Sequence, residues 1–419
     1  MRRLVDLDSS GNPALGDPGI VGDKAARLAR ARGLGLPVLP GRVVPVRDAE
    51  EALGQGVAAL GPGGSGAARL AVMDVILDPP LAGELEEALM EMGAPVVVRS
   101  SSPLEADGAW AGAFSSFHDI GAADIAVAVR GCWASVFSVD VLGRAEAMGL
   151  PVESIRLAVL IQRQVHPTAG GTAAFAADRV VTVETVQGSP AALLGGWQRG
   201  NRTEVRPDGS LTPVEGGPAL PEPAGLPWPS VLTEVAEVLR RLHAATGEDL
   251  IEWALGAEGV VLLQTRHAGG GGRSPGRDGL VKGATRGCGA SVQGTAAAPG
   301  IGAGPALVAP DPHALEGPPA TPGYVVVAPS PLPALAPLLW GASALVTATG
   351  GPGAHLVDVA RSLRVPAVVS APVEDLVGPL VGGAGSSRVL LVDGGTGLVC
   401  AVRAEAGASA EAPAGEERT

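Results

Sequence analysis

The sequence predicts a mixed α/β protein with more than one domain. Its 419 residues exceed the length at which one hydrophobic core normally keeps growing, so two or three domains are expected. Strand-like runs such as 96–99 and 324–328 alternate with helical patterns such as 232–246, which favours an α/β fold. The run AGGGGRSPGRDG after His267 is too rich in glycine to pack into a core and divides the chain in two.

The composition change at this run sets the expected domain limits. We expect a first domain over 1–268, a flexible linker over 269–290, a smaller α/β domain over 291–403 and a disordered acidic tail over 404–419. As a glycine-rich coil the linker would span roughly 25 Å on average and about 70 Å when extended. That reach would let one domain swing relative to the other.

Composition and charge exclude several classes of protein. Hydrophobic residues make up 46% and charged residues 17%, which is typical of a globular chain. The net charge of -13 argues against a nucleic-acid partner, which would require a basic face. Cys132, Cys288 and Cys400 have neither the spacing of a zinc site nor that of a disulfide framework, so a reducing cytoplasm is expected. Without a signal peptide or an apolar run of ~18 residues, no membrane partner is expected.

Two groups in the first half could bind phosphate. Lys24 follows Gly22-Asp23 at a predicted helix start, and the only other lysine of the chain is Lys282. An ammonium at a glycine-led helix start suits phosphate, although a solvated lysine on an exposed face remains open. Arg99 ends a strand and precedes three serines, which suits polyphosphate oxygens; a surface ion pair is the alternative.

A predicted hairpin over 250–265 carries a third group. Glu252 and Gln264 would face the same side, because both lie on strands and their separation across the turn is even. A carboxylate and an amide oxygen suit Mg²⁺, and Arg266 could neutralise phosphates that the ion bridges. An outward-facing polar stripe would produce the same pattern.

The fourth group is His355, at the end of the run TGGPGAH over 349–355. It follows a strand and begins a predicted helix over 354–363, where backbone amides stabilise an anion. A histidine here could accept phosphate as a nucleophile; a hydrogen-bonded helix-start histidine is the alternative.

Taken in order, these groups resemble the phosphoenolpyruvate synthase, pyruvate phosphate dikinase and rifampicin phosphotransferase family. The resemblance extends to about residue 403. The matching runs, which resemble segments of that family, are VGDKA at 21–25, VLPG at 38–41, VVRSSS at 97–102 with Glu105, WAG at 110–112, AVLIQRQV at 158–165, IEWA at 251–254, LLQTR at 262–266, APGIGAGP at 298–305, TGGPGAH at 349–355, VAR at 359–361 and VPAVV at 365–369.

The resemblance implies an ATP-grasp-type nucleotide-binding domain followed by a small swivelling phosphohistidine domain. ATP and Mg²⁺ would be the cofactors, and ATP would pyrophosphorylate His355 with release of AMP before phosphate passes to an acceptor. The residues implied to act are the catalytic group His355, Arg99 and Lys24, the nucleotide contacts Lys24, Arg99, Glu105, Gly112, Gln162, Glu184, Gln264 and Arg266, and the metal ligands Glu252 and Gln264. The WAG run would be a lid loop over the phosphates.

The chain also departs from the family pattern. Asp23 would place a carboxylate beside Lys24, and Ala354, Leu356 and Ser362 differ from the usual residues around the histidine. The length leaves no room for the third, acceptor-binding domain of these relatives, so the acceptor is expected at the domain interface or on a partner. A phosphocarrier subunit serving a separate protein and a nucleotide-binding regulator without turnover both remain open.

Overall fold

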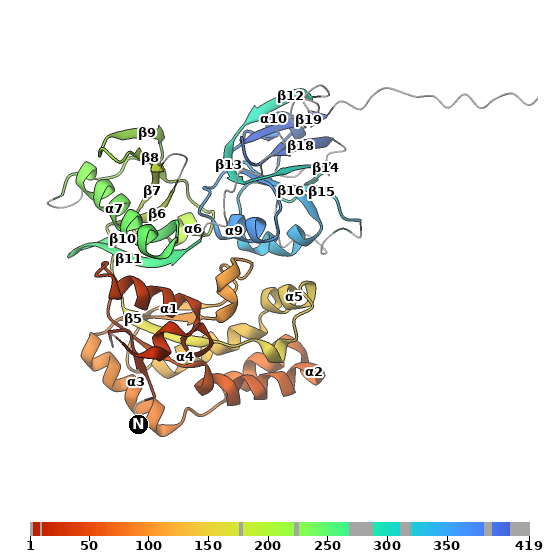
Figure 1. Ribbon diagram of the computed structural model, residues 1–419. Coiled ribbons are helices and arrows are strands. Elements are labelled where there is room, and N and C mark those ends of the chain that lie inside the picture. Colours follow the sequence, from red (N-terminus) through yellow and green to blue (C-terminus); the bar gives the residue numbers. More distant parts are fainter. Residues whose placement is uncertain are drawn as a thin grey trace, which may run out of the picture.

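Three β-sheets with helices packed on them form the computed structural model (Figure 1). The structure describes residues 3–8, 11–175, 179–221, 226–267, 288–310, 319, 321–380 and 388–402. The helices are α1 (Pro18–Gly33), α2 (Glu50–Met73), α3 (Pro79–Met92), α4 (Ile125–Ala134), α5 (Val139–Ala147), α6 (Ala191–Leu194), α7 (Trp228–Thr246), α9 (His355–Ser362) and α10 (Glu374–Val377). Short 3-10 helices include η3 (Pro103–Asp107), η4 (Ser135–Phe137) and η9 (Pro333–Trp340).

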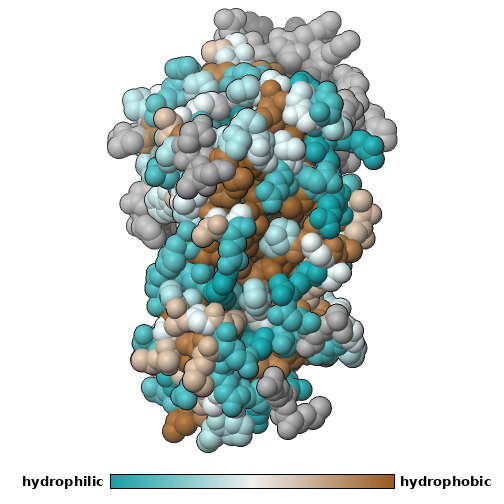
Figure 2. Space-filling model, turned by 90° about the vertical axis from the view of Figure 1, so that its left-hand side faces the viewer, coloured by the Kyte–Doolittle hydropathy of each residue, from teal (hydrophilic) through white to brown (hydrophobic). Residues whose placement is uncertain are grey.

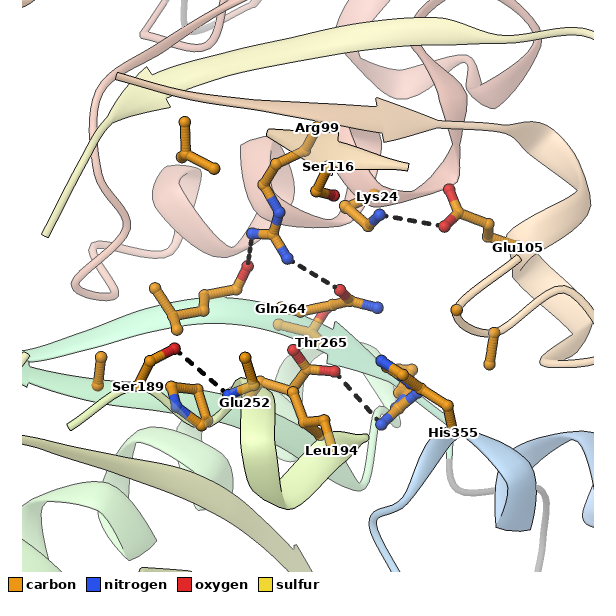
Figure 3. A pocket seen from close by; sticks show the side chains of 18 of the residues that line it. Lys24, Arg99, Glu105, Ser116, Ser189, Leu194, Glu252, Gln264, Thr265 and His355 are labelled. Carbon is orange, nitrogen blue, oxygen red and sulfur yellow. Dashed lines mark hydrogen bonds and ion pairs between the residues drawn. The ribbon is translucent and has the colours of Figure 1, made fainter. Parts of the chain in front are cut away.

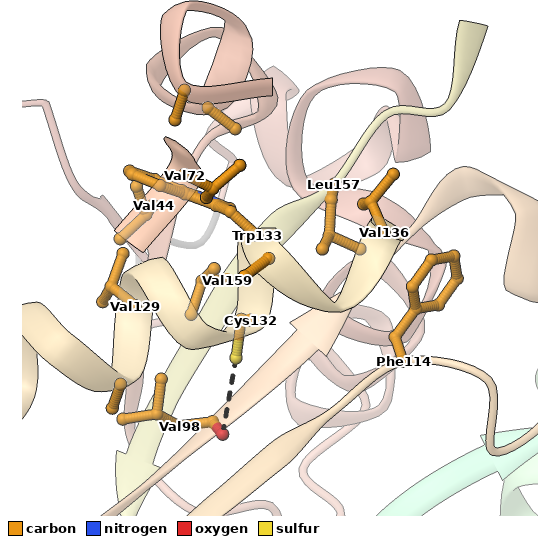
Figure 4. Close-up of a cluster of buried hydrophobic side chains, with 14 of the residues drawn as sticks. Val44, Val72, Val98, Phe114, Val129, Cys132, Trp133, Val136, Leu157 and Val159 are labelled. Carbon is orange, nitrogen blue, oxygen red and sulfur yellow. Dashed lines mark hydrogen bonds between the residues drawn. The ribbon is translucent and has the colours of Figure 1, made fainter. Parts of the chain in front are cut away.

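The first sheet has the strand order β1-β2-β5-β3-β4, with all neighbours antiparallel. Its strands are β1 (Val5–Asp6), β2 (Gly41–Val44), β3 (Val96–Ser101), β4 (Ser116–Ile120) and β5 (Ala158–Arg163). Valines of these strands pack against α2 and α4 around the buried Trp133, next to the Cys132 thiol (Figure 4). This apolar cluster fixes β3, whose last residues include Arg99.

The second sheet is antiparallel throughout, in the order β11-β10-β6-β7-β8-β9. Its strands are β6 (Ala169–Phe175), β7 (Val181–Gln187), β8 (Asn201–Val205), β9 (Leu211–Glu215), β10 (Leu250–Gly256) and β11 (Gly259–Arg266). Helix α7 covers one face with an apolar stripe. Helix α1 contacts both β5 of the first sheet and β11 of the second, so Lys24 lies at their junction.

The third sheet belongs to the C-terminal part of the chain, residues 288–402. Its order is β12-β19-β18-β14-β15-β16-β17-β13, and β14 to β17 are parallel neighbours. The strands are β12 (Cys288–Gln293), β13 (Thr295–Ala298), β14 (Ile301–Val308), β15 (Tyr324–Ala328), β16 (Ala342–Thr347), β17 (Ala367–Val369), β18 (Val389–Asp393) and β19 (Leu398–Val402). Helix α9 follows β16 and packs with η9 on one face of this sheet (Figure 1).

The expected α/β fold class is confirmed, and most element positions agree closely with the sequence. Strand β15 has the predicted limits, and α9 begins one residue later and ends one residue earlier than expected. Helices α4 and α5 are separate, because Ser138 has extended backbone and caps α5. Residues 288–290, predicted as the end of the linker, form the start of β12, while the rest of the linker and the tail 404–419 lie outside the described residues.

The cysteine expectation needs one correction. Cys400 is disulfide-bonded, although no disulfide was expected from the spacing. Cys132 is a free thiol in the first core, and burial raises its pKa to about 12.

The surface carries no extended apolar face in the view of Figure 2, where hydrophobic residues are interspersed with hydrophilic ones and gather most at mid-height. In the part of the chain that the structure describes, no single helix is long and apolar enough to cross a membrane. The segment formed by α4 and η4 is long and apolar enough only when it is taken together with α5, and the two are bent by 40° relative to each other.

Candidate functional site

A cavity of about 690 Å³ lies between the N-terminal part of the chain, residues 3–267, and helix α9 of the C-terminal part. Side chains from α1, β3, β5, β10, β11 and α9 line it, so its walls come from all three sheets or the helices on them. Figure 3 shows Arg99 and Lys24 on one side and Glu252 and His355 on the other. Among the predicted site residues, those that line this cavity are Lys24, Arg99, Glu105, Gly112, Gln162, Glu252, Gln264, Arg266 and His355.

Lys24 is held by a break in α1. Gly22 has φ 76° and ψ 161°, a backbone conformation essentially restricted to glycine, and a Cβ there would lie 2.1 Å from the Ser101 carbonyl oxygen. The close approach lets the Lys24 Nζ donate to the Ser100 carbonyl at 2.9 Å and pair with Glu105 Oε1 at 3.1 Å. The side chain is 8% exposed, so the solvated-lysine alternative is excluded.

Two amides at the helix start are already bonded within the fold. The Asp23 amide donates to the Ser102 carbonyl and the Ala25 amide to Ser101 Oγ. Likewise Ser102 caps η3 and donates to the Arg156 carbonyl, so two of the three serine hydroxyls expected to bind phosphate serve the fold. Asp23 lies beside Lys24 in sequence, but its carboxylate accepts from Arg27 Nε at 2.6 Å.

Arg99 crosses from the first sheet to the second. Its guanidinium donates to the Leu263 carbonyl at 2.9 Å and to Gln264 Oε1 at 3.2 Å (Figure 3). Burial lowers the Arg99 pKa, and the carboxylates of Glu252 and Glu105 oppose that shift. Arg99 is thus a link between sheets rather than a surface ion pair.

A β-bulge brings the two predicted metal ligands together. The hairpin of β10 and β11 keeps one register from the pair Gly256↔Gly259 to the pair Trp253↔Leu262. The register shifts by one residue between Trp253 and Glu252, so that Glu252 pairs directly with Gln264. The two side chains do share one face of the hairpin, as predicted, but the predicted reason was wrong. The register of an uninterrupted hairpin would pair Glu252 with Leu263 and turn Gln264 to the other face, and the bulge is what pairs Glu252 with Gln264. The bulge also exposes the Leu263 carbonyl to Arg99.

Arg266 connects the hairpin to the C-terminal part. It pairs with Glu252 Oε1 at 3.3 Å, donates to the Gly353 carbonyl at 3.3 Å and forms an ion pair with Asp358 on α9. Asp358 Oδ1 in turn pairs with Arg361 at 2.8 Å. Burial raises the Asp358 pKa, against the two arginines, which lower it.

His355 is the first residue of α9 and lines the cavity. Burial, followed by the nearby charge of Arg266, lowers its pKa from 6.5 to about 4. Its Nδ1 is buried and has no hydrogen-bond partner within the described residues, so the hydrogen-bonded alternative considered from the sequence does not hold for that nitrogen. A neutral imidazole faces the same space as Lys24, Arg99 and Arg266.

The loop 108–112, which contains the predicted lid at 110–112, packs against α9. A Cβ on Gly112, which has φ 66°, would lie 3.0 Å from His355 Cδ2, and one on Gly108 would lie 2.8 Å from Ser362 Oγ. The buried Arg144 of α5 holds this loop by donating to the carbonyls of Ala109 and Ala111 at 2.8 and 3.1 Å.

The glycines before His355 make an equally close contact with the second sheet. A Cβ on Gly351 would lie 2.3 Å from the Glu184 carboxylate, and one on Gly353 would lie 2.9 Å from Thr172 Cγ2. Glu184, predicted as a nucleotide contact, therefore does not line the cavity: it lies behind this glycine loop, because β7 is farther from β11 in the sheet.

Several cavity residues were not singled out from the sequence. Asp358 could have been found, because it lies three residues after His355 and thus on the same face of α9. Arg361 lies in the VAR run but received no role. His118, His166 and His267 line the cavity although no histidine except His355 had a telling sequence context.

Comparisons with known proteins agree with this arrangement. Residues 19–196 match the model of the AMP/ATP-binding domain of pyruvate phosphate dikinase, and residues 320–397 match the mobile domain of PEP-utilising enzymes. The fold and the matched domains define a protein with a nucleotide-binding part followed by a mobile-domain part. These two matches, together with the relatives described next, support the phosphoenolpyruvate synthase and pyruvate phosphate dikinase family.

Two relatives are described as probable phosphoenolpyruvate synthases. The protein of Staphylothermus marinus is 25% identical over 378 residues, which cover 71% of this chain and 44% of the relative. That of Methanothermobacter thermautotrophicus is 25% identical over 448 residues, covering 91% of this chain and 61% of the relative. The chain therefore spans about half the length of these relatives.

Solved structures resemble the chain only weakly. D-alanyl-alanine synthetase A from Vibrio cholerae is 12% identical, with a TM-score of 0.30 over 61% of this chain and 57% of that chain. A dinucleotide-forming acetyl-coenzyme A synthetase 1 from Ca. Korarchaeum cryptofilum is 10% identical, with a TM-score of 0.30 over 58% of this chain and 90% of that chain.

Proposed function

We propose that the chain is an ATP-dependent phosphotransferase of the dikinase type. ATP would pyrophosphorylate His355 with release of AMP, hydrolysis would leave phosphohistidine, and the C-terminal part would then move to deliver phosphate to an acceptor. One observation carries the proposal: His355 opens into the same cavity as Lys24, Arg99 and Arg266.

The first step uses the neutral imidazole of His355 as the nucleophile. Its lone pair forms a bond to the β-phosphorus of ATP while the bond from that phosphorus to the bridging oxygen of the α-phosphate breaks, and AMP leaves with that electron pair. The lowered pKa keeps the ring unprotonated near neutral pH, so no separate base is needed to expose the lone pair. Because Nδ1 is buried, we assign the attack to Nε2.

The cations of the cavity would stabilise the charge that moves in this step. Phosphoryl transfer depends chiefly on positioning and on neutralising phosphate oxygens. Lys24, Arg99 and Arg266 come from three different elements and converge on the cavity, which suits a chain of phosphates. Each would have to exchange a present partner for phosphate: Glu105 for Lys24, Gln264 for Arg99, and Glu252 and Asp358 for Arg266.

The residues present fit Mg²⁺ bound together with ATP. Glu252 Oε1 is buried, has no hydrogen-bond donor within the described residues beyond its ion pair with Arg266, and lies across the ladder from Gln264, so two hard oxygen ligands are available. Among the described residues no group of three or more His, Cys, Asp or Glu could hold a metal ion, so further ligands would have to be phosphate oxygens and water. The bound ion would shield the negative charge of the phosphates.

The acceptor of the phosphate is the open part of the proposal. The relatives extend well beyond the length that this chain matches, so a separate protein could hold the acceptor and this chain would then be the phosphocarrier. A regulator that binds nucleotide without turnover is the second candidate, because Lys24 and Arg266 already have carboxylate partners.

The test is incubation with Mg²⁺ and ATP labelled at the β-phosphate, using wild type, His355→Ala and the control His243→Ala, whose side chain contacts the Glu248 carbonyl outside the cavity. We expect AMP and acid-labile protein label with wild type and the control, and neither with His355→Ala. ATP binding without AMP or label in wild type would favour the regulator and reject the transferase.

A further inference from the structure

Asp358 is a carboxylate that the family resemblance did not single out, and it lies at the centre of the interface. It is on α9, one helical turn after His355, and it is 5% exposed. Its two oxygens face two arginines: Oδ1 pairs with Arg361 of the same helix, and Oδ2 pairs with Arg266 of β11. The second pair joins the C-terminal part of the chain to the N-terminal part.

Arg361 would remain in place without Asp358. Its Nε donates to the Ala297 carbonyl at 2.8 Å and its second terminal nitrogen donates to the Pro352 carbonyl at 2.7 Å. Within the described residues, Arg266 in contrast reaches the C-terminal part only through Asp358 and the longer contact to the Gly353 carbonyl at 3.3 Å. The position of Arg266 relative to α9 therefore depends strongly on Asp358.

We propose that Asp358 is a positioning residue that acts as an internal anion: it holds Arg266 against α9 while the cavity contains no phosphate, and it competes with phosphate for the same guanidinium. The inference rests on the proposed function only in taking the cavity as a polyphosphate site. Two consequences follow, one before nucleotide binds and one after transfer.

Before nucleotide binds, the ion pair between Arg266 and Asp358 keeps His355 in the wall of the cavity. Without this carboxylate, Arg266 and Arg361 would face each other across the interface, with Glu252 paired to Arg266 and the more distant charge of Asp249 acting on Arg361. Uncompensated buried charges of this kind are strongly unfavourable. The ion pair thus favours the docked arrangement at the expense of nucleotide affinity, since phosphate must displace a carboxylate from Arg266.

After transfer, the same carboxylate favours separation. Side chains three apart on a helix are neighbours, so a phosphate on His355 would place negative charge next to Asp358 on the face that meets Arg266. Like charges at this spacing repel each other, and both would require the same guanidinium. Asp358 would therefore help the phosphorylated C-terminal part to leave the cavity.

An ordinary interface salt bridge is the competing explanation, and nucleotide affinity separates the two. Binding of a non-hydrolysable ATP analogue with Mg²⁺ would be measured by calorimetry for wild type, Asp358→Asn and Asp358→Glu. The matched control is Asp375→Asn, an exposed aspartate of α10 outside the cavity. Small-angle scattering of the same proteins without nucleotide would report how compact they are.

We expect Asp358→Asn to bind the analogue roughly five- to tenfold more tightly, as expected when an ion-pair competitor of this kind is removed, and to be less compact without nucleotide. Asp358→Glu, which keeps the charge, should stay near wild type, as should the control. Unchanged or weaker analogue binding by Asp358→Asn, with its thermal unfolding intact, would overturn the proposal. If Asp358→Asn does not fold, Asp358→Ser takes its place under the same criterion.

This experiment does not depend on turnover. If wild type forms no AMP but Asp358→Asn still binds the analogue more tightly, the transferase proposal fails and the internal-anion proposal stands. If wild type forms AMP and analogue binding by Asp358→Asn is unchanged, the reverse holds.

Discussion

Single residues decide where the charges of the cavity lie. Gly22 permits the approach of α1 to β3 that delivers Lys24, and Gly112 leaves room for the ring of His355. Asp358 and Glu105 supply negative charge to arginine and lysine side chains that would otherwise be buried without compensation. At this scale the site is a set of cations with polar or charged partners, which phosphate would replace in the proposed function.

Gly22→Ala should destabilise the protein and misplace Lys24. The substitution adds a Cβ 2.1 Å from the Ser101 carbonyl oxygen in a conformation that other residues rarely adopt, so the free energy of unfolding should fall by about 3 kcal/mol or more. Urea denaturation checks this. Gly33→Ala, in the same helix with nothing within 4 Å of its Cβ, is the control and should change stability by less than about 1 kcal/mol. Equal stability of both variants would contradict the prediction.

The lowered pKa of His355 predicts a pH-dependent stability. Between about pH 4 and 6.5 the unfolded state would bind more protons at this residue than the folded state, so the contribution is fully present above 6.5 and is lost as pH falls towards 4. Urea denaturation at about pH 7 and about pH 5 should therefore show a larger loss of stability in wild type than in His355→Asn. An NMR titration of the free protein that places the His355 pKa near 6.5 would contradict the assignment.

Secondary-structure elements orient these residues. The bulge in the hairpin of β10 and β11 pairs Glu252 with Gln264 and turns the Leu263 carbonyl towards Arg99. Helix α5 has the same kind of role for the loop 108–112, because Arg144 is fully buried and binds two of its carbonyls. The bulge sets the position of Glu252 relative to Gln264, and Arg144 sets the position of the loop 108–112.

Arg144→Lys should loosen the loop 108–112. A lysine ammonium cannot reproduce the planar contacts to Ala109, Ala111 and Asp140, so unfolding should become easier by about 2 kcal/mol. Hydrogen exchange of the amides in 108–112 should become faster. Arg156→Lys is the matched control, since Arg156 also binds two carbonyls but is exposed, and its exchange pattern should remain that of wild type.

At the scale of the molecule, the interface between the two parts of the chain is close and contains several polar contacts. It combines the Arg266–Asp358 pair with the glycine loop against Thr172 and Glu184 and with a bond from Arg199 to the Ala348 carbonyl at 2.6 Å. Polar interfaces of this kind allow relative movement of the two sides more readily than apolar ones. In the proposed function, a histidine that receives phosphate here and delivers it elsewhere would require such an interface.

Gly353→Ala should separate the two parts without unfolding either. Gly353 has no positive φ, so the new methyl group is not strained locally, but it would lie 2.9 Å from Cγ2 of the buried and stiff Thr172. We expect a larger radius of gyration and AMP formation reduced more than about tenfold, with analogue affinity raised as in Asp358→Asn, because separation takes Asp358 away from Arg266. Gly83→Ala on α3, with nothing within 4 Å, is the control. Unchanged scattering and AMP formation would contradict the prediction.

Much of this fold and site could be predicted because the signals are local. Strand β15 and helix α9 follow from apolar runs and periodicity, and the chemistry of Lys24, Arg99 and His355 follows from residue types next to glycine or at element ends. The order of these groups along the chain then indicated the resemblance to a known family. Nearly all of the predicted residues line one cavity; Glu184 is the exception.

The sequence by itself determined which residues could bind phosphate and in what order they occur, because side-chain chemistry and local backbone preference do not require distant contacts. Only the tertiary structure decided their partners: the bulge between Glu252 and Gln264, the pairing of Arg266 with Asp358, and the position of Glu184 behind the glycine loop. These depend on strand register and on the approach of segments far apart in the chain. No local pattern encodes either one, because a one-residue slip reverses the facing of a strand and an ion pair forms only where packing brings both charges together.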